Sequence, residues 1–196
     1  MTGLPKQPDV SPQALTVLVL CGGAGRRLGG LDKPLQRWRG EPMIDCVLAQ
    51  MPSQCATLIS ANRNLPSYAA RGSVFTDAEV CEALHGTPLI GILGGLERSA
   101  TDWVLVSPGD TPALETGWWQ ALCDKPGPAG SVIHDGERQQ HLHLLLHTSN
   151  APGLRSYLAR GHVQVWRWLA ELDIRTILYP HPEQFRNVNR PEDLNT

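Results

Sequence analysis

The strongest constraint on the fold is the uninterrupted apolar run Leu15–Leu20, whose letters are LTVLVL. A run of apolar and β-branched residues is typical of a strand buried on both faces, as in a parallel sheet. Such a sheet needs helices on both faces, because the crossover connections between parallel strands place them there. The glycine-rich stretch 21–30 follows directly, so the chain leaves this strand through a loop with unusual backbone freedom.

Strand-like and helix-like segments alternate along the rest of the chain. We expect further strands at 56–61, 73–76, 103–107, 131–134, 142–147 and 175–179. Helices are expected at 43–51, 89–98, 114–123, in two pieces within 151–172 around Gly161, and from Pro191 onward. The alternation predicts the α/β class, with a mostly parallel, Rossmann-like sheet and helices on both faces. Asp135-Gly136 indicates one antiparallel hairpin.

Length and composition narrow the class of protein. The 196 residues fit one domain, which we place at 15–196 behind a flexible, proline-containing arm at 1–14. The net charge of −2 offers no basic field for nucleic acid, and the early apolar run is far too short for a membrane span. The five cysteines are odd in number and widely spaced, which is typical of reduced thiols in a cytoplasmic protein.

The loop after the first strand combines glycines with cations. Arg26, Arg27 and Lys33 supply three positive charges, and Asp32 is the one acidic residue among them. Glycines let backbone N–H groups approach phosphate oxygens, and the cations add charge-assisted hydrogen bonds. The loop therefore predicts a polyphosphate site, although a mobile glycine-rich surface loop is the alternative.

Two common glycine motifs do not fit this loop. The dinucleotide fingerprint G-x-G-x-x-G would use Gly23 and Gly25, but its third glycine falls on Leu28. The P-loop needs serine or threonine after its lysine, whereas Pro34 follows Lys33. Neither motif therefore accounts for this loop.

Six further blocks in order along the chain resemble those of a known family. The run LCGGAGRRLGGLDK at 20–33 is similar to the signature of molybdenum cofactor guanylyltransferase, which has the nucleotide-diphospho-sugar-transferase-like α/β fold. The further blocks are SANR at 60–63, FTD at 75–77, PLIG at 88–91, SPGDTP at 107–112, HDGER at 134–138 and FRNVNRPEDL at 185–194. The resemblance implies transfer of GMP from GTP to the terminal phosphate of molybdopterin, which gives the guanine dinucleotide cofactor and pyrophosphate.

The resemblance also implies roles for individual residues. The implied nucleotide-binding residues are Leu20, Cys21, Gly22, Gly23, Lys33, Ser60, Asn62, Asp77 and Asp110. Asp110 would bind Mg²⁺, Asn187 and Asn189 would face the molybdopterin, and Lys33, Asp110 and Arg26 are the candidate catalytic residues. Cys21 stands where the family usually has alanine, and Ser60 replaces a common asparagine. GTP and molybdopterin are the implied substrates, with cofactor-delivery or molybdoenzyme-maturation proteins as further partners.

The chemistry of this transfer explains the residue types. The attacking phosphate is already anionic, so no strong general base is needed. The site must instead stabilise charge on the α-phosphate and pyrophosphate, which suits Mg²⁺, a carboxylate and cations. Asp110 follows an expected strand and could hold the metal, although it could instead be a structural turn residue. A helix-capping or turn role is likewise the structural alternative for Asp77, and Asn189 could cap the start of the last helix.

Other interpretations stay open at this point. His141, His143 and His147 could suggest zinc, but their spacing does not establish a ligand set. Another small-molecule nucleotidyltransferase, either a molybdopterin cytidylyltransferase or one that forms a sugar nucleotide, is one rival function. A non-catalytic nucleotide-binding protein of the same fold is the other.

Overall fold

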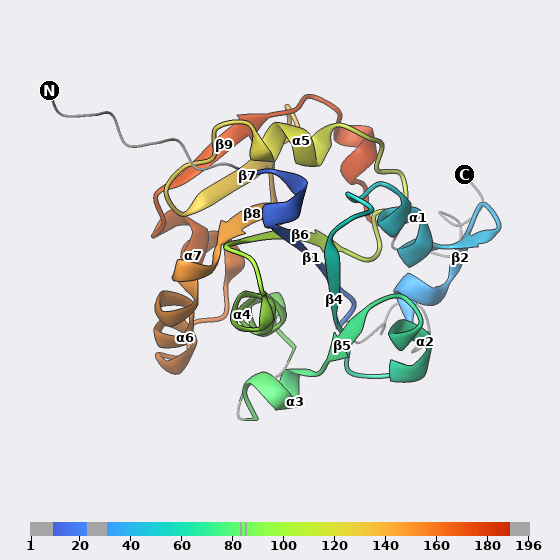
Figure 1. The fold of residues 1–196 in the computed structure, drawn as a ribbon, viewed down its shortest axis with the longest axis horizontal. Helices are drawn as coiled ribbons and strands as arrows, with labels where there is room; N and C mark the ends of the chain where they lie inside the picture. The colour runs from blue at the N-terminus through green and yellow to red at the C-terminus, as the bar shows by residue number, and fades with distance from the viewer. Residues whose placement is uncertain (1–9, 23–30, 83, 85, 189–196) are drawn as a thin grey trace, which may run out of the picture.

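The protein is described by a computed structural model that covers residues 10–22, 31–82, 84 and 86–188. Its centre is a seven-stranded sheet with the order β5-β4-β1-β6-β8-β7-β9 (Figure 1). The strands are β1 Leu15–Leu20, β4 Ala56–Ser60, β5 Ser73–Phe75, β6 Trp103–Pro108, β7 Gly130–His134, β8 Gln139–His147 and β9 Ile174–Leu178. This architecture confirms the predicted α/β class.

The sheet changes character at β6. Strands β5, β4, β1 and β6 are mutually parallel, whereas β8 pairs antiparallel with both β6 and β7, and β9 returns parallel to β7. Leu20 is in register with Ser60 on one side and with Pro108 on the other. The parallel strands therefore end at one level, and the residues that follow them meet at one edge.

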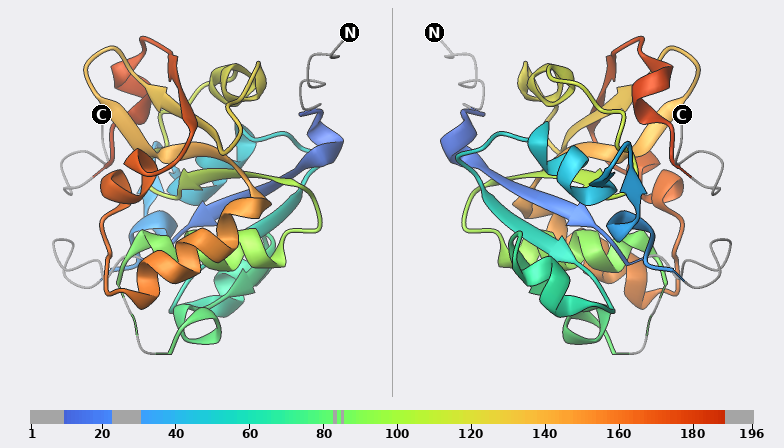
Figure 2. Two further views of the ribbon diagram at one scale, coloured as in Figure 1. Left: turned by 90° about the vertical axis from the view of Figure 1, so that its left-hand side faces the viewer. Right: turned by 90° about the vertical axis from the view of Figure 1, so that its right-hand side faces the viewer.

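Helices cover both faces because side chains alternate along the buried strands. Val17 and Val19 of β1 join one apolar cluster, and Leu18 joins the other. The first cluster packs under α1 Met43–Ala49, α2 Leu65–Ala69 and α5 Trp118–Cys123. The second packs under α3 Asp77–Val80, α4 Pro88–Arg98, α6 Ala151–Ala159 and α7 Val165–Ala170. Figure 2 shows α6 running beside α4.

The antiparallel hairpin forms where it was predicted. Gly136 has φ +100°, which favours glycine, and Asp135 Oδ1 accepts the N–H groups of Glu137 and Arg138 at 2.8 and 2.7 Å. The register jumps from Val132↔Leu144 to Ile133↔Gln140, so β8 bulges at 141–143. Strand β8 thus begins at Gln139, earlier than the predicted strand at 142–147, and continues through the bulge.

Several expected boundaries were wrong. The helix expected at 114–123 begins only at Trp118, because Gly117 has φ +111°, which a helix does not accommodate. The short helices α2 and α3 were missed, as was a small hairpin, β2 Arg37–Trp38 with β3 Glu41–Pro42. Elements of two to five residues are too short for periodicity to detect. The helix expected from Pro191 lies outside the described residues.

The ends of the chain are described only in part. The short 3₁₀ helix η1 Pro12–Ala14 precedes β1, Cys55 Sγ donates to Pro12 O at 3.0 Å, and Val10 packs against the first cluster. Val10 and Pro12 of the expected arm therefore contact the body of the domain, while the domain limits of 15–196 stay a prediction. In the described part of the chain, no helix has the length and apolarity needed to cross a membrane.

Candidate active site

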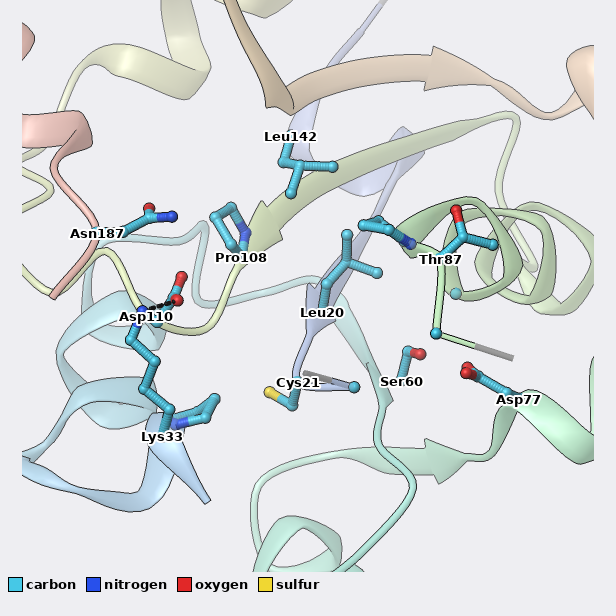
Figure 3. Close-up of a pocket in the computed structure, with 15 residues that line it drawn as sticks. Leu20, Cys21, Lys33, Ser60, Asp77, Thr87, Pro108, Asp110, Leu142 and Asn187 are labelled. Atoms are coloured by element: carbon cyan, nitrogen blue, oxygen red, sulfur yellow. Dashed lines mark hydrogen bonds and ion pairs between the residues drawn. The ribbon is translucent and has the colours of Figure 1, made fainter. Parts of the chain in front are cut away.

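A cleft of about 240 Å³ opens where the parallel strands end (Figure 3). Its walls come from the ends of β1, β4 and β6, from the start of α3 and α4, from β8 and from the segment after η5 Pro182–Phe185. The lining residues are Leu20, Cys21, Gly22, Lys33, Pro34, Ser60, Asp77, Gly86, Thr87, Pro88, Gly91, Pro108, Asp110, Leu142 and Asn187. The cleft thus occupies the edge where open α/β sheets bind their ligands.

Backbone hydrogen bonds continue beyond the strand ends and fix this edge. Cys21 N donates to Ser60 O at 2.8 Å, and Gly109 N donates to Leu20 O at 3.0 Å. Ala61 N donates to Phe75 O at 3.0 Å. The three loops that leave β1, β4 and β6 are therefore held side by side, and the side chains that follow each strand face one space.

Most of the predicted site residues gather at this cleft. The residues that line it are Leu20, Cys21, Gly22, Lys33, Ser60, Asp77, Asp110 and Asn187. Asn62 lies beside them: its Nδ2 atom is close to Gly22, at 3.3 Å from the position that a Cβ atom on Gly22 would take. Gly23, Arg26 and Asn189 lie outside the described residues.

An ion pair spans the cleft on one side. Lys33 Nζ contacts Asp110 Oδ2, and both side chains are largely buried (Figure 3). Lys33 begins the 3₁₀ turn η3 Lys33–Leu35, and Asp110 lies just beyond β6. Val188 N donates to Asp110 O at 3.1 Å, which ties the segment that carries Asn187 to the same loop. A cation, a carboxylate and an amide from distant parts of the chain therefore converge.

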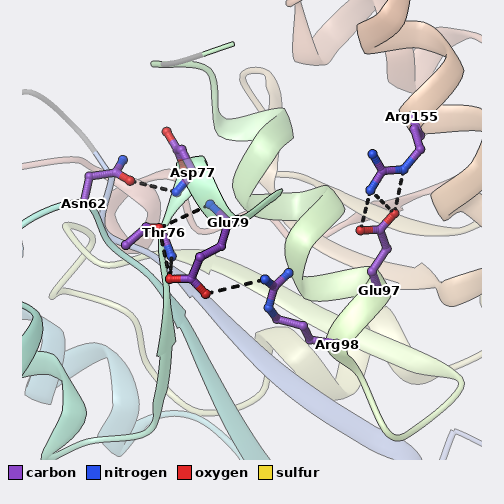
Figure 4. Close-up of polar contacts among 7 residues, drawn as sticks. All are labelled: Asn62, Thr76, Asp77, Glu79, Glu97, Arg98 and Arg155. Carbon is purple, nitrogen blue, oxygen red and sulfur yellow. Dashed lines mark hydrogen bonds and ion pairs between the residues drawn. The ribbon is translucent and has the colours of Figure 1, made fainter. Parts of the chain in front are cut away.

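The opposite side of the cleft carries a second carboxylate. Asp77 is 5% exposed and is the first residue of α3, but Thr76 caps that helix through a reciprocal arrangement with Glu79 (Figure 4). The backbone N–H of Asp77 donates to Asn62 Oδ1 at 2.8 Å. Figure 3 shows the Asp77 carboxylate directed toward Ser60. Asp77 is therefore not the capping residue, and its carboxylate faces the cleft.

Residues that sequence reasoning missed come from the start of α4. Thr87 caps this helix, with Oγ1 accepting from Leu89 N at 3.3 Å, and Pro88 takes the first helical position. A Cβ atom on Gly91 would lie 2.6 Å from Ser60 Oγ, so glycine lets α4 approach β4 closely. The Thr-Pro pair is a helix-start signature that could have placed this helix end, although not its contact with the cleft.

A larger cavity of about 1040 Å³ adjoins the cleft and shares Asn187 with it. The β2–β3 hairpin and α1 form one wall, and the loop at 112–115 and the segment 183–188, which includes most of η5, form the other. Its side chains include Trp38, Arg39, Glu115 and Arg186. Arg39 stacks over Trp38, with the guanidinium carbon 4.3 Å from the ring centroid. The cleft and the larger cavity thus meet at Asn187.

Cysteine and histidine side chains near the cleft are buried and uncharged. Burial raises the pKa of the Cys21 thiol well above its ordinary value, and the charge of Asp32 raises it further. Burial lowers the pKa of His143 to about 3, and its ring packs edge-on against Trp118 and Phe185. Within the described residues, no three His, Cys, Asp or Glu side chains are grouped so as to hold a metal ion. The described histidines therefore do not form a zinc site.

Comparison with known proteins shows the class of protein to which this chain belongs. Residues 17–176 match the family model of the MobA-like NTP transferase domain. The fold also resembles that of a nucleotidyl transferase from Methanothermobacter thermautotroptrophicus, with a TM-score of 0.71 and 18% identity over 92% of this chain and 94% of that one. A molybdopterin-guanine dinucleotide biosynthesis protein A from Archaeoglobus fulgidus has a TM-score of 0.70 and 20% identity over 91% and 94% of the two chains. The chain is a nucleotidyltransferase.

Curated relatives narrow the class to a family. A molybdenum cofactor guanylyltransferase from Mannheimia succiniciproducens is 36% identical over 93% of this chain and 97% of its own length. Its counterpart from Polynucleobacter asymbioticus is 31% identical over 94% and 96% of the two chains. The chain belongs to the molybdenum cofactor guanylyltransferase family.

Proposed function

We propose that this protein transfers GMP from GTP to the terminal phosphate of molybdopterin, which releases pyrophosphate and forms the guanine dinucleotide cofactor. The observation that carries the proposal is the Lys33–Asp110 pair, which lies in the cleft at the strand ends, beside a second cavity that shares Asn187. A transferase that joins two substrates needs two adjacent spaces with charged groups at their junction. The relatives named above carry the same activity in their names.

The nucleoside end of GTP would lie between the start of the glycine-rich loop and α3. Leu20, Cys21 and Gly22 would contact the base and ribose, together with Gly23, while Ser60, Asn62 and Asp77 would complete the guanosine pocket. Guanine presents two adjacent N–H donors, at N1 and N2, which a carboxylate can accept together. Cytosine presents an acceptor at the corresponding ring nitrogen, which a carboxylate would repel. Asp77 thus offers a physical reason for guanine over cytosine.

The phosphate end would lie at the ion pair. Lys33 would bind phosphate oxygens, with Arg26 as a further cation, and Asp110 would hold Mg²⁺. Magnesium takes few protein ligands and completes its shell with water and phosphate oxygens, so the carboxylate of Asp110, on the side of the cleft that carries Lys33, fits the ion. When bound, the metal would offset the charge that develops on the phosphates. The attacking phosphate needs no proton removed, so the protein's work is positioning and charge stabilisation.

The acceptor would occupy the larger cavity. Asn187 stands at the junction and would hold the molybdopterin, together with Asn189, so that its phosphate faces the cleft. The stacked Trp38 and Arg39 provide an aromatic face and a cation, which suit a flat, anionic pterin. We expect the enzyme to work in the cytoplasm with proteins that deliver the cofactor or mature molybdoenzymes. The five cysteines are unpaired, as that compartment favours.

Nucleotide titration and a transfer assay test this proposal. GTP should bind far more tightly than CTP, ATP or UTP in calorimetry with Mg²⁺ present, and pyrophosphate should appear only when molybdopterin is added. Equal or tighter binding of CTP would favour a cytidylyltransferase. Tight GTP binding without pyrophosphate release would favour a non-catalytic nucleotide-binding protein.

A further inference from the structure

The residue before Lys33 is a buried acid whose charge plays no part in the scheme above. The Asp32 side chain is 3% exposed. Tyr68 Oη donates to Asp32 Oδ1 at 2.8 Å, and Asn64 Nδ2 donates to Oδ2 at 2.9 Å. Arg63 Nε lies 3.7 Å from the same Oδ2 and supplies the opposite charge. All three partners belong to the segment 63–68, which follows β4.

The Asp32 carboxylate bonds to a distant segment of the chain and not to the turn that Asp32 begins. Asp32 takes the N-cap position of the 3₁₀ turn Lys33–Leu35, where an aspartate often bonds its own turn, yet it makes no such bond. Its backbone carbonyl accepts from Leu35 N at 3.2 Å and from Gln36 Nε2 at 3.1 Å. Its carboxylate can therefore accept hydrogen bonds from the segment after β4. Arg63 also donates to Leu31 O at 2.9 Å, which fixes the chain on the other side of Asp32.

The same segment after β4 begins at the nucleoside end of the cleft. Ser60 lines the cleft and Asn62 binds the backbone of Asp77, only a few residues before Arg63 and Asn64. The hydrogen bonds of Asp32 link this segment to the neighbouring residue Lys33, whose ammonium group faces Asp110. We propose that Asp32 is a positioning residue that holds the Lys33 ammonium group at a fixed span from the nucleoside pocket. The role in transfer rests on the proposed function, since the span matters only for a bound nucleoside triphosphate.

A double-mutant cycle tests whether Asp32 acts through Lys33. Asp32→Asn keeps the size but removes the charge that Arg63 neutralises, so kcat/KM for GMP transfer should fall about tenfold. In a Lys33→Ala background the same change should have less than about a twofold effect, because there is no ammonium group left to position. Glu97→Gln is the matched control: it weakens the two-armed Glu97–Arg155 ion pair between α4 and α6, away from the cleft (Figure 4). Its small effect should be the same in both backgrounds.

A second readout reports on Lys33 without any turnover. The chain has three lysines, Lys6, Lys33 and Lys125, so reductive ¹³C-methylation gives few lysine signals in NMR spectra. The Lys33 signal should lie apart from that of Lys125 in the wild type and move toward it in Asp32→Asn. Tyr68→Phe removes one donor and should give a smaller shift in the same direction, which keeps the test open if Asp32→Asn does not fold.

Different results would overturn the positioning role of Asp32 and the proposed transferase function. An unchanged Lys33 signal in folded Asp32→Asn, or equal losses of kcat/KM in both backgrounds, would overturn the positioning role. A wild-type protein that neither binds GTP nor forms pyrophosphate would overturn the proposed function, while the NMR shift would still decide whether Asp32 positions Lys33.

Discussion

Replacing Gly91 with alanine tests whether the cleft depends on the close approach of α4 to the sheet. An added Cβ atom would lie 2.6 Å from Ser60 Oγ, 2.8 Å from Leu20 Cδ2 and 3.1 Å from Ser60 Cβ. The first two atoms can rotate away, whereas Ser60 Cβ is fixed to its strand. Alanine gains roughly 0.5–1 kcal/mol over glycine in a helix, and overpacking costs about 1–3 kcal/mol. We therefore expect a net loss of unfolding free energy of about 1 kcal/mol.

The effect on nucleotide binding should be clearer than the effect on stability. The Ser60 and Leu20 side chains line the cleft, so any rotation away from residue 91 changes the surface that the nucleoside meets. The loss of one hydrogen bond, worth about 0.5–1.5 kcal/mol, corresponds to a roughly two- to tenfold weaker GTP affinity. Urea unfolding measures the first quantity, and calorimetric titration of GTP with Mg²⁺ measures the second.

Gly153 provides a matched control within another helix. It lies exposed in α6, and a Cβ atom there would meet nothing within 4 Å. Gly153→Ala should therefore stabilise the protein by roughly 0.5–1 kcal/mol and leave GTP affinity unchanged. If Gly91→Ala behaves in the same way, the close approach of α4 does not shape the nucleotide site, and the reasoning is refuted.

Three further predictions address the site and the core. Asp110→Asn should retain the melting temperature while GMP transfer falls at least about a hundredfold; normal turnover would reduce Asp110 to a turn residue. Asn187→Ala should keep GTP affinity within about threefold but slow transfer to molybdopterin, and lost GTP binding in folded protein would contradict its placement beside the pterin. Burial lowers the pKa of His143 from 6.5 to about 3, so between these values the unfolded chain binds a proton that the folded protein does not. The free energy of unfolding should therefore be highest above pH 6.5 and decline as the pH falls toward 3. His143→Phe should flatten that decline by up to about 1.4 kcal/mol per pH unit in urea titrations, and an identical slope would refute the assignment.

The sequence predicts the fold well where long apolar runs decide it. The run in β1 and the alternation after it indicate a parallel sheet covered on both faces, because only burial on both sides makes such a run favourable. Hairpin β2–β3 could not be found in this way, since its strands have two residues each and Arg39 adopts φ 50°. Propensity carries little information over such short segments.

The site is predictable in part for a similar reason. Residues that directly follow strands, such as Cys21 and Asp110, must meet at the carboxyl edge of a parallel sheet, so chain order alone brings them together. The contribution of Thr87 depends on where α4 begins in space, which the sequence does not specify. The burial of Asp32 is the clearest example: its letter shows a charge within a basic loop, but its partners lie about thirty residues away.

The change of strand direction at β6 has a consequence for how such a chain can diversify. The parallel strands β1, β4 and β6 end at the cleft, whereas Leu142 is the one residue that β7 and β8 contribute to its lining in the described part of the chain. Among the described residues, none that lines the larger cavity belongs to β7, β8 or β9, so substitutions along these strands leave the walls of that cavity in place. On the proposed function, we therefore expect changes of acceptor preference to arise in the β2–β3 hairpin, in α1 and in the segments 112–115 and 183–188, and not in the antiparallel half of the sheet.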